Sequence, residues 1–387
     1  MVIPSNITTG HHDRTSRAAR SLSVTGTLPQ ARAEVVCLGE SMVTFLPSRP
    51  GPLADVPSFD RTIGGAESNV ACALAAAGHR VRWISRVGAD GFGDHLVRSV
   101  AAYGVDTSGV RRDPHRPTGV YFRTATDRAT DAHEVVYYRA GSAASAMSPQ
   151  NMAPEDLWSG TLLHLSGITA ALSDGCLALM RALTARVPGR PLVSFDVNHR
   201  PNLWRDPSGV RVLLDLARGA DLVFVGEDEA AAAWDLHGAE EIRAALPEPR
   251  TLVVKRGAAG ATVHTREPER DAVADGTEGA ATAGTAYGHD TVVSVPALRV
   301  DVVAPVGAGD AFAAGFLSAT LRGLPAAARL RHGHLMAAAA LTVPGDLGAP
   351  PARADADRLA ALDARAWGRL RLGPGWTEAT EQEVRTP

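Results

Sequence analysis

The sequence predicts an α/β protein with one large, mostly parallel β-sheet, helices on both faces of that sheet, and a second, smaller sheet. The first observation behind this prediction is a series of short apolar runs that alternate along the chain with helical segments. Strands that are apolar throughout are typical of parallel sheets, because such sheets are buried on both faces. Strands are expected at residues 34–38, 81–87, 162–166, 192–196, 222–225 and 252–255.

The second observation concerns the ends of the first helices. Residues 66–77 and 92–103 have helical composition, and each segment is followed at once by a glycine, Gly78 or Gly104. Glycine is common just after a helix because it adopts the left-handed backbone conformation without steric cost. The chain is therefore expected to begin with the β–α–β repeat of a parallel sheet.

Two segments that break this repeat are the third observation. Residues of about 42–62 and 117–140 are rich in β-branched and aromatic side chains that alternate with polar ones, which is typical of a half-exposed sheet. We expect them to form a small lid. The folded domain is expected to span residues 34–364, with a disordered leader at 1–33, a flexible Gly-, Ala- and Thr-rich loop at 265–290 and a C-terminal tail at 365–387.

The composition of the 387 residues excludes several classes of function. A formal net charge of −3 provides no basic surface for nucleic acid. No apolar run approaches the roughly 20 residues that span a bilayer, so the protein is expected in the cytoplasm. Cys37, Cys72 and Cys176 lack metal or disulfide spacing and are expected to be buried thiols. Lys255 is the only lysine, so a GxxxxGK[ST] phosphate loop is absent.

Polar residues that follow the predicted strands are candidate ligand contacts, because open parallel sheets bind ligands beyond the carboxyl ends of their strands. The glycine pair Gly64-Gly65 lets backbone approach a ligand, and Asn69 can both donate to and accept from a hydroxyl. Arg200 and Arg139 can each bind a carboxylate or phosphate through two parallel hydrogen bonds. A plain turn before a helix, and two solvated surface arginines, are the alternatives.

The stretch Gly307-Ala308-Gly309-Asp310 precedes an apolar helical run. Backbone N–H groups at a helix start, together with the helix dipole, form an anion site. We expect the same field to keep Asp310 ionised, so that its carboxylate can take a proton from a hydroxyl that attacks a phosphorus atom. The alternative is an aspartate that only caps its own helix.

Taken together, these motifs resemble in order and spacing the ribokinase-like (PfkB) carbohydrate kinases, over about residues 34–350. The matching segments are Gly64-Gly-Ala-Glu-Ser-Asn69, Val87-Gly-Ala-Asp-Gly-Phe-Gly93, Asp196-Val-Asn-His-Arg200, Lys255-Arg-Gly-Ala-Ala-Gly260 and Gly307-Ala-Gly-Asp310. Within the family the chain is most similar to 2-keto-3-deoxygluconate kinases, through residues 137–143, 163–168 and 345–349.

The resemblance implies a ribokinase-like three-layer sandwich with a small β-sheet lid through which a homodimer or higher homo-oligomer forms. It also implies phosphoryl transfer from ATP, with Mg²⁺, to a primary hydroxyl of a sugar acid. Asp310 would be the base, and Gly307, Ala308 and Gly309 would form the anion hole. The sugar acid would contact Gly65, Asn69, Tyr121, Tyr138, Arg139, Arg200 and Asp346. The nucleotide would contact Asn198, Lys255, Arg256, Gly257, Gly260, Gly307 and Gly309, and Glu229 would help to order the metal.

Two departures from the family pattern concern ions. Ala304 stands where family members usually carry an acidic residue, which affects a monovalent-cation site beside the anion hole. Gly226 replaces the asparagine of the Asn-x-x-Glu motif, although Glu229 is kept. The alternatives to a sugar-acid kinase are a fructokinase or another sugar kinase of the family, and a non-catalytic sugar or nucleotide sensor. A dehydrogenase is disfavoured because no glycine fingerprint follows the first strand.

Overall fold

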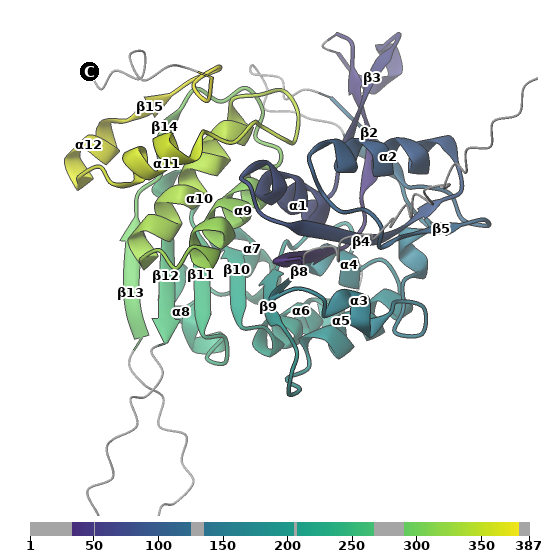
Figure 1. The fold of residues 1–387 in the computed structure, drawn as a ribbon, viewed down its shortest axis with the longest axis horizontal. Coiled ribbons are helices and arrows are strands. Elements are labelled where there is room, and N and C mark those ends of the chain that lie inside the picture. The colour runs from purple at the N-terminus through teal and green to yellow at the C-terminus, as the bar shows by residue number, and fades with distance from the viewer. Residues whose placement is uncertain (1–32, 50, 125–134, 205–206, 267–289, 379–387) are drawn as a thin grey trace, which may run out of the picture. The chain divides into compact units, whose positions relative to one another are not determined.

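The main sheet of the protein has nine strands in the order β13-β12-β11-β10-β9-β8-β1-β4-β5 (Figure 1). We analysed a computed structural model, which describes residues 33–49, 51–124, 135–204, 207–266 and 290–378. The strands from β5 to β11 are parallel, and β12 and β13 complete the sheet in antiparallel pairing. The bounds are β1 Val35–Leu38, β4 Val81–Gly88, β5 Val110–Asp113, β8 Leu162–Ser166, β9 Leu192–Asp196, β10 Leu222–Gly226, β11 Thr251–Lys255, β12 Ala261–Arg266 and β13 Asp290–Val295.

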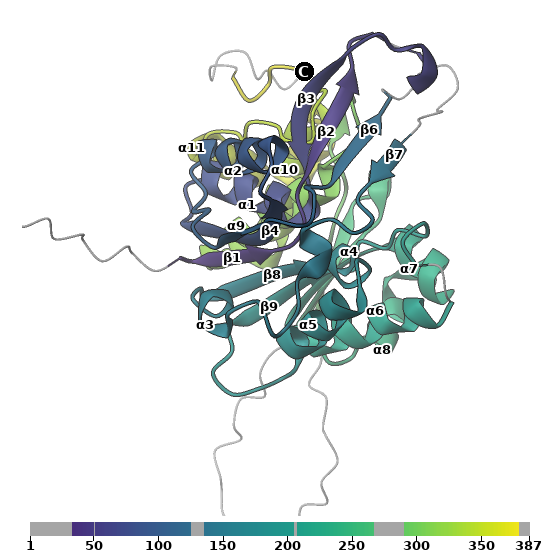
Figure 2. The ribbon, with the colours of Figure 1, turned by 90° about the vertical axis from the view of Figure 1, so that its right-hand side faces the viewer.

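Helices cover both faces of this sheet, as the apolar strands predict (Figures 1 and 2). In β1, Val35 and Cys37 belong to one hydrophobic core and Val36 and Leu38 to the other, because successive side chains of a strand point to opposite faces. One face carries α1 Ala66–Ala76, α2 Gly91–Ala102, α9 Ala308–Leu321, α10 Ala326–Leu341 and α11 Arg353–Ala360. The other carries α3 Pro154–Leu157, α5 Asp174–Thr184, α6 Pro207–Gly219, α7 Glu227–Trp234 and α8 Gly238–Ala245, and α4 Gly167–Ala170 follows β8.

The smaller sheet has four strands in the order β3-β2-β6-β7, and Figure 2 shows it apart from the main sheet. Its strands are β2 Met42–Pro47, β3 Phe59–Gly64, β6 Val120–Arg123 and β7 Val135–Tyr138, all within the two predicted lid segments or at their margins. Single-turn 3₁₀ helices lie at Leu53–Asp55, Ala144–Ala146 and Gly257–Ala259. The predicted leader and most of the predicted loop (1–32 and 267–289) lie outside the described residues.

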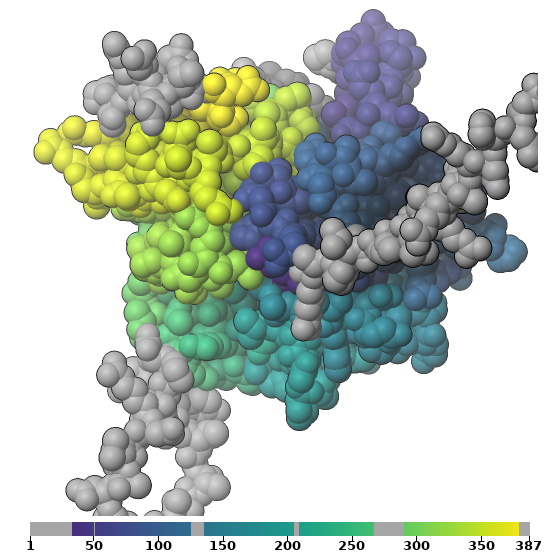
Figure 3. All heavy atoms as spheres, in the orientation of Figure 1, coloured from purple at the N-terminus to yellow at the C-terminus, as the bar shows by residue number. Residues whose placement is uncertain are grey.

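The prediction that residues after 364 form a tail is wrong for 365–378. They form α12 Ala364–Arg369 and β15 Arg371–Leu372, which pairs with β14 Arg299–Val300. Trp367 is 1% exposed, and its indole N–H donates to the Pro296 carbonyl at 3.0 Å. Figure 3 shows this C-terminal segment, in yellow, packed against the green helices. Residues 379–387 lie outside the described part of the chain.

Within the described residues, every helix is too short or too polar to cross a lipid bilayer.

Candidate active site

Two adjoining cavities lie at the carboxyl edge of the main sheet, beside the small sheet. The Asn69 cavity, of about 210 Å³, is lined by the start of α1, and the Lys255 cavity, of about 570 Å³, by the ends of β9 and β11. Eight residues line both: Tyr121, Tyr137, Asn198, Arg200, Asn202, Val306, Gly307 and Asp310. The edge of the sheet at which they lie is the one that the sequence predicts.

Asp310 stands on the wall that the two cavities share. It lies in the first turn of α9, after the N-cap residue Gly307. Its Oδ2 accepts a hydrogen bond of 2.8 Å from Nδ2 of Asn69 in the first turn of α1. The starts of two helices, far apart in the sequence, therefore meet at one carboxylate.

The protonation of Asp310 differs from the prediction that the helix dipole keeps it ionised. Burial raises the pKa of Asp310 to about 7, and the charge of Asp196 adds to this rise. The hydrogen bond from Asn69 and the charges of Arg200 and Lys255 oppose it and lower the pKa. A carboxyl group that titrates near neutral pH is well matched to accepting and returning a proton.

The backbone at Gly307 is shaped by a close contact with Asp346. Gly307 has φ of 75°, and a Cβ placed on it would lie 2.1 Å from the Asp346 carbonyl oxygen. This left-handed residue turns the chain into α9, whose first N–H groups lack helical partners and can bind an anion. Gly309 lines the Lys255 cavity, whereas Ala308 lines neither cavity.

The carboxylate of Asp346, expected to contact the sugar acid, is held by the small sheet. Its Oδ1 accepts from Arg123 Nη2 at 2.9 Å and its Oδ2 from the Tyr121 hydroxyl at 3.2 Å. The side chains of Arg123 and Asp346 are 7% and 4% exposed. Burial raises the pKa of Asp346, and the pairing with Arg123 opposes that rise. Asp346 lines the Asn69 cavity with both of its oxygens already engaged.

The two predicted arginines both line the Asn69 cavity but differ in their pairing. Arg139 forms an ion pair with Glu40, whose carboxylate is buried and also accepts from the Ser142 hydroxyl. Arg200 is exposed and forms no ion pair with any residue that the structure describes. The cavity therefore holds one neutralised and one unneutralised guanidinium group.

The prediction for Tyr138 is not supported, because the strand presents its neighbour to the site. Tyr137 lines both cavities and its ring lies 5.4 Å from that of Tyr121. Tyr138 is 64% exposed, lines neither cavity and packs edge-on against Phe122. Adjacent residues of a strand point to opposite faces, so only one of two consecutive tyrosines can face the cavity.

Lys255 and Glu229 line the Lys255 cavity. The ammonium of Lys255 donates to both oxygens of Asp196, at 3.1 and 3.0 Å. Glu229 Oε2 accepts from the backbone N–H of Gly226 at 2.8 Å. Asn198 lines both cavities with φ of 40°, which asparagine tolerates better than most residues. The predicted nucleotide contacts Arg256, Gly257 and Gly260 follow β11 but line neither cavity.

The donor set fits a metal that arrives with a substrate. Among the described residues, no three His, Cys, Asp or Glu side chains are placed to hold an ion together. Mg²⁺ is usually held by one or two carboxylates plus substrate phosphates. Glu229 has one oxygen engaged by the Gly226 N–H and lies in the larger cavity, so it suits that kind of site.

Sequence reasoning missed three residues of the site, Tyr137, Glu40 and Arg123, and it identified the segment that contains Asp196 without predicting that Asp196 pairs with Lys255. Glu40 and Asp196 stand at or just after the ends of β1 and β9, a position that marks them as candidates. Their partners, Arg139 and Lys255, lie 99 and 59 residues away along the chain (139 − 40 and 255 − 196), so the pairing itself has no local signal.

Comparison with known proteins places the chain in a family. Residues 32–353 match the model of the pfkB family carbohydrate kinases. The chain is 32% identical to a 2-dehydro-3-deoxygluconokinase of Thermoproteus tenax (85% of this chain, 95% of the relative) and 34% identical to one of Bacillus subtilis (83% and 94%). It also superposes, with a TM-score of 0.70 and 24% identity, on a protein described as a ribokinase II from E. coli, solved with ATP and Mg²⁺ (84% and 98%). The fold, the cavities and these relatives establish that the chain is a carbohydrate kinase of the pfkB family.

Proposed function

We propose that the protein transfers the γ-phosphoryl group of ATP to a primary hydroxyl of a sugar acid, 2-keto-3-deoxygluconate. One observation carries this proposal: Asp310 and Gly307 stand on the wall shared by two cavities. A phosphoryl transfer needs the acceptor alcohol and the donor phosphate on either side of a base and an anion site. The Asn69 cavity would hold the sugar acid and the Lys255 cavity the triphosphate.

In the proposed reaction the acceptor oxygen attacks the γ-phosphorus while the bond from that phosphorus to the bridging oxygen of ADP breaks. Asp310 takes the proton of the attacking hydroxyl, and the backbone N–H groups of residues 307–309 stabilise charge on the transferred group. Lys255 lies close enough to lower the pKa of Asp310 and adds positive charge on the donor side. Mg²⁺, held by the phosphates and Glu229, would neutralise charge on the β- and γ-phosphates.

Two features of the Asn69 cavity support a hydroxyl-rich acid. The side-chain oxygens of Asn69 and Asn198 are buried without a hydrogen-bond partner among the described residues, and substrate hydroxyls could donate to both. Arg200 has no acidic partner among the described residues, so it can bind a substrate carboxylate. The 2-dehydro-3-deoxygluconokinases among the relatives are consistent with this substrate.

A neutral ketose is the second candidate substrate, because Glu40 neutralises Arg139. With that pair intact, the cavity carries one unpaired cation rather than the two that the sequence suggests. A bound ketose would leave Arg200 without a carboxylate partner, at little cost in free energy, because the Arg200 side chain is exposed to water.

The test is an ADP-release assay with 2-keto-3-deoxygluconate, its galactonate-derived epimer, fructose and ribose, for the wild type and Asp310→Asn. We expect kcat/KM to be highest for a keto-deoxy acid and to fall by about 10² to 10⁴ in Asp310→Asn. Binding of the acid, measured by calorimetry, should change far less. A preference for fructose would favour the second candidate, and equal, slow turnover by both proteins would favour a sensor.

We also propose that two copies pair through the face of the small sheet that carries Tyr138, whose side chain is 64% exposed and lines neither cavity. Light scattering should give a dimer mass for the wild type and a monomer mass for Tyr138→Arg, which adds charge to that face. A dimer mass for both proteins would contradict this arrangement.

A further inference from the structure

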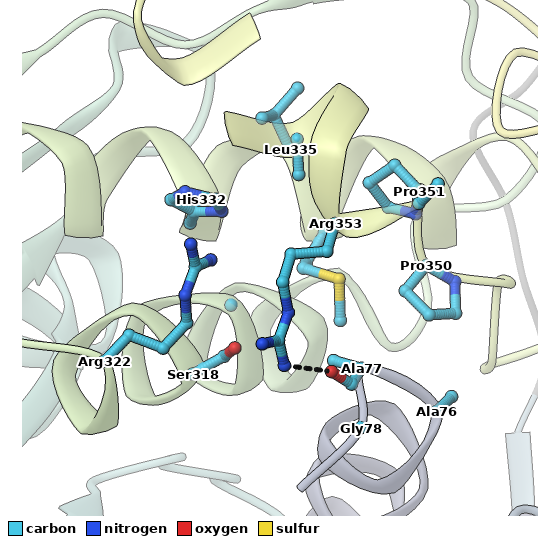
Figure 4. Close-up of a pocket in the computed structure, with 14 residues that line it drawn as sticks. Ala76, Ala77, Gly78, Ser318, Arg322, His332, Leu335, Pro350, Pro351 and Arg353 are labelled. Carbon is cyan, nitrogen blue, oxygen red and sulfur yellow. Dashed lines mark hydrogen bonds between the residues drawn. The ribbon is translucent and has the colours of Figure 1, made fainter. Parts of the chain in front are cut away.

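A third cavity, which we call the distal cavity, lies at the opposite ends of the two helices that form the active site (Figure 4). It has a volume of about 360 Å³, within the range of small-molecule sites. Its walls come from the C-terminal ends of α1 and α9, the middle of α10 and the start of α11. The lining residues that bear on its chemistry are Ala76, Arg322, His332, Leu335, Met336 and Arg353.

Two guanidinium groups line this cavity, and one of them is paired: Arg322 forms an ion pair with Asp357, whereas Arg353 forms no ion pair with any residue that the structure describes. Figure 4 shows Arg322 reaching in from α9 and Arg353 from the start of α11. None of the lining residues is acidic. His332 Nε2 lies 3.2 Å from an oxygen of Asp357, which raises the pKa of His332, but burial and the charge of Arg322 lower that pKa overall. The imidazole is therefore neutral near pH 7 and contributes hydrogen-bonding groups rather than charge.

Structural roles use only part of the hydrogen-bonding capacity of the two arginines. Arg353 Nη2 donates to the Ala77 carbonyl at 3.2 Å, which caps the end of α1. Arg322 Nη2 binds both oxygens of Asp357, at 2.7 Å each. A guanidinium has five N–H donors. Nε and Nη1 of each arginine have no hydrogen bond to the described residues and are not sealed inside the protein.

The rest of the lining is largely apolar. Leu335 and Met336 are buried on α10, and Pro350 and Pro351 close the cavity on the side of α11. Small-molecule sites commonly combine such walls with a few converging polar groups. The fitting ligand has an anionic group for the unpaired charge of Arg353 and the remaining N–H donors of Arg322, and a short carbon body for the apolar side.

The distal cavity and the active site are built from the same segments of the chain. The starts of α1 and α9 meet at the Asn69–Asp310 hydrogen bond, and their far ends meet at the distal cavity. Asp346, whose carbonyl oxygen abuts Gly307, lies four residues before Pro350. Three segments that shape the catalytic edge therefore continue into the walls of the distal cavity.

We propose that the distal cavity binds a small organic anion, a carboxylate or a phosphate monoester, and that this binding alters the affinity of the Asn69 cavity for its substrate. By linkage, substrate must then alter the affinity for the anion by the same factor. The proposed anion binding is argued from the lining of the distal cavity alone. The coupling step rests on the proposed role of the Asn69 cavity as the acceptor site.

The binding test is calorimetric titration of the full-length protein with butyrate, glycerol 3-phosphate and inorganic phosphate. These probes separate a carboxylate, a phosphate monoester and a bare phosphate. The variants are Arg353→Met, which removes a cation, and Ala76→Phe, which fills the cavity from an exposed position. Arg358→Met on the same helix is the control, because Arg358 pairs with Asp355 and does not line the cavity. Arg200→Ala identifies any binding at the active site.

We expect saturable binding of butyrate or glycerol 3-phosphate that is weakened at least about tenfold by Arg353→Met and by Ala76→Phe, and unchanged in Arg358→Met. Binding lost in Arg200→Ala but kept in Arg353→Met would place the anion at the active site and overturn the proposal. No saturable binding of any probe by the wild type would overturn it as well.

The coupling test repeats the titration with 2-keto-3-deoxygluconate, with and without the saturating anion. An equal, reciprocal shift in both affinities, absent in Arg353→Met, supports coupling, and unchanged affinities refute it. If the anion binds but the sugar acid does not bind at all, the proposal of a distal anion site would still hold. The proposed substrate of the Asn69 cavity would then be contradicted.

Discussion

Asn69 and Asp310 form the hydrogen bond that joins the two helices of the active site, at 2.8 Å across 241 residues of sequence. The contact does more than position the base. Because an amide N–H stabilises the ionised carboxylate, the hydrogen bond lowers the pKa of Asp310 and opposes burial, which is the largest cause of its net rise to about 7. The pH range in which the base is active therefore depends on Asn69.

Asn69→Ala should shift the pH profile of the kinase to higher pH. Asp310 accepts a proton only when ionised, so kcat/KM of the wild type should rise with pH through about 7 and level off above it. Loss of the Asn69 donor raises the pKa of Asp310 and moves that midpoint upward. The measurement is the pH dependence of kcat/KM for both proteins.

Asn151→Ala is the control for this shift. Asn151 also makes two local hydrogen bonds, to the Ser148 N–H and the Ala146 carbonyl, but it lines neither active-site cavity. It should lower the melting temperature without moving the pH midpoint. An unshifted midpoint in Asn69→Ala would show that another group sets the protonation of the base.

Arg200→Ala should raise KM for a keto-deoxy sugar acid by about 10- to 100-fold, because a hydrogen bond to a charged group contributes about 1.5–3 kcal/mol. KM for fructose should change little, since a neutral sugar has no carboxylate for the guanidinium to bind. The comparison of KM for the two substrates in wild type and variant is the measurement. An equal increase for both would remove the argument that Arg200 selects an acid.

The strands and the catalytic motif could be predicted from the sequence because their signals are local. Apolar residues make up most of Leu162–Ser166 and Leu192–Asp196, and every residue of the two strands except Leu192 is buried. Strand β5, with the sequence Val-Arg-Arg-Asp, lies at the edge of the sheet and carries no such run. It was not expected.

The pairing of charges and the direction of side chains could not be predicted, because they depend on distant segments. Arg123 and Asp346 are 223 residues apart, and their ion pair follows only from the packing of the small sheet beside α9. The choice between Tyr137 and Tyr138 is fixed by which face of β7 meets the cavity. A strand of two adjacent tyrosines contains no signal for that choice.

Gly307→Ala should lower both stability and activity. An alanine at φ of 75° is strained, and its Cβ would lie 2.1 Å from the Asp346 carbonyl oxygen, so the two loops would have to separate. Gly309→Ala is the matched control for folding, because its Cβ would meet only the Lys255 ammonium at 3.6 Å. Thermal unfolding should show a large decrease for the first and a small one for the second. Equal decreases would contradict the steric argument.

Trp367→Ala should destabilise the protein by about 3–5 kcal/mol, the usual cost of removing a large buried aromatic side chain. Trp367 packs in the core, and the guanidinium of Arg331 lies 4.9 Å from its ring. Urea unfolding measures the change, with Trp376→Ala as a second probe of the same segment. If Trp367→Ala lowers the free energy of unfolding by less than about 1 kcal/mol, residues 365–378 would contribute little to the fold, as expected of a tail.

Arg123→Met should destabilise the protein more at pH 8 than at pH 5. Removing one partner of a buried ion pair costs about 3–5 kcal/mol, because the other charge remains buried and unpaired. Burial already raises the pKa of Asp346, and loss of Arg123 raises it further. When a carboxyl group has a higher pKa in the folded state than in the unfolded state, the protein loses stability as the pH rises from the unfolded pKa to the folded pKa.

Urea unfolding of Arg123→Met at both pH values measures this effect, and Arg358→Met is the control, since its exposed pair with Asp355 should contribute less than about 1 kcal/mol. The kcat of Arg123→Met should fall as well, because Asp346 tethers the small sheet to the backbone at Gly307. If stability falls while kcat is kept, the ion pair only stabilises the fold. If stability and kcat both fall, and Asp346→Asn lowers them in the same way, the small sheet positions the anion site through the ion pair between Arg123 and Asp346.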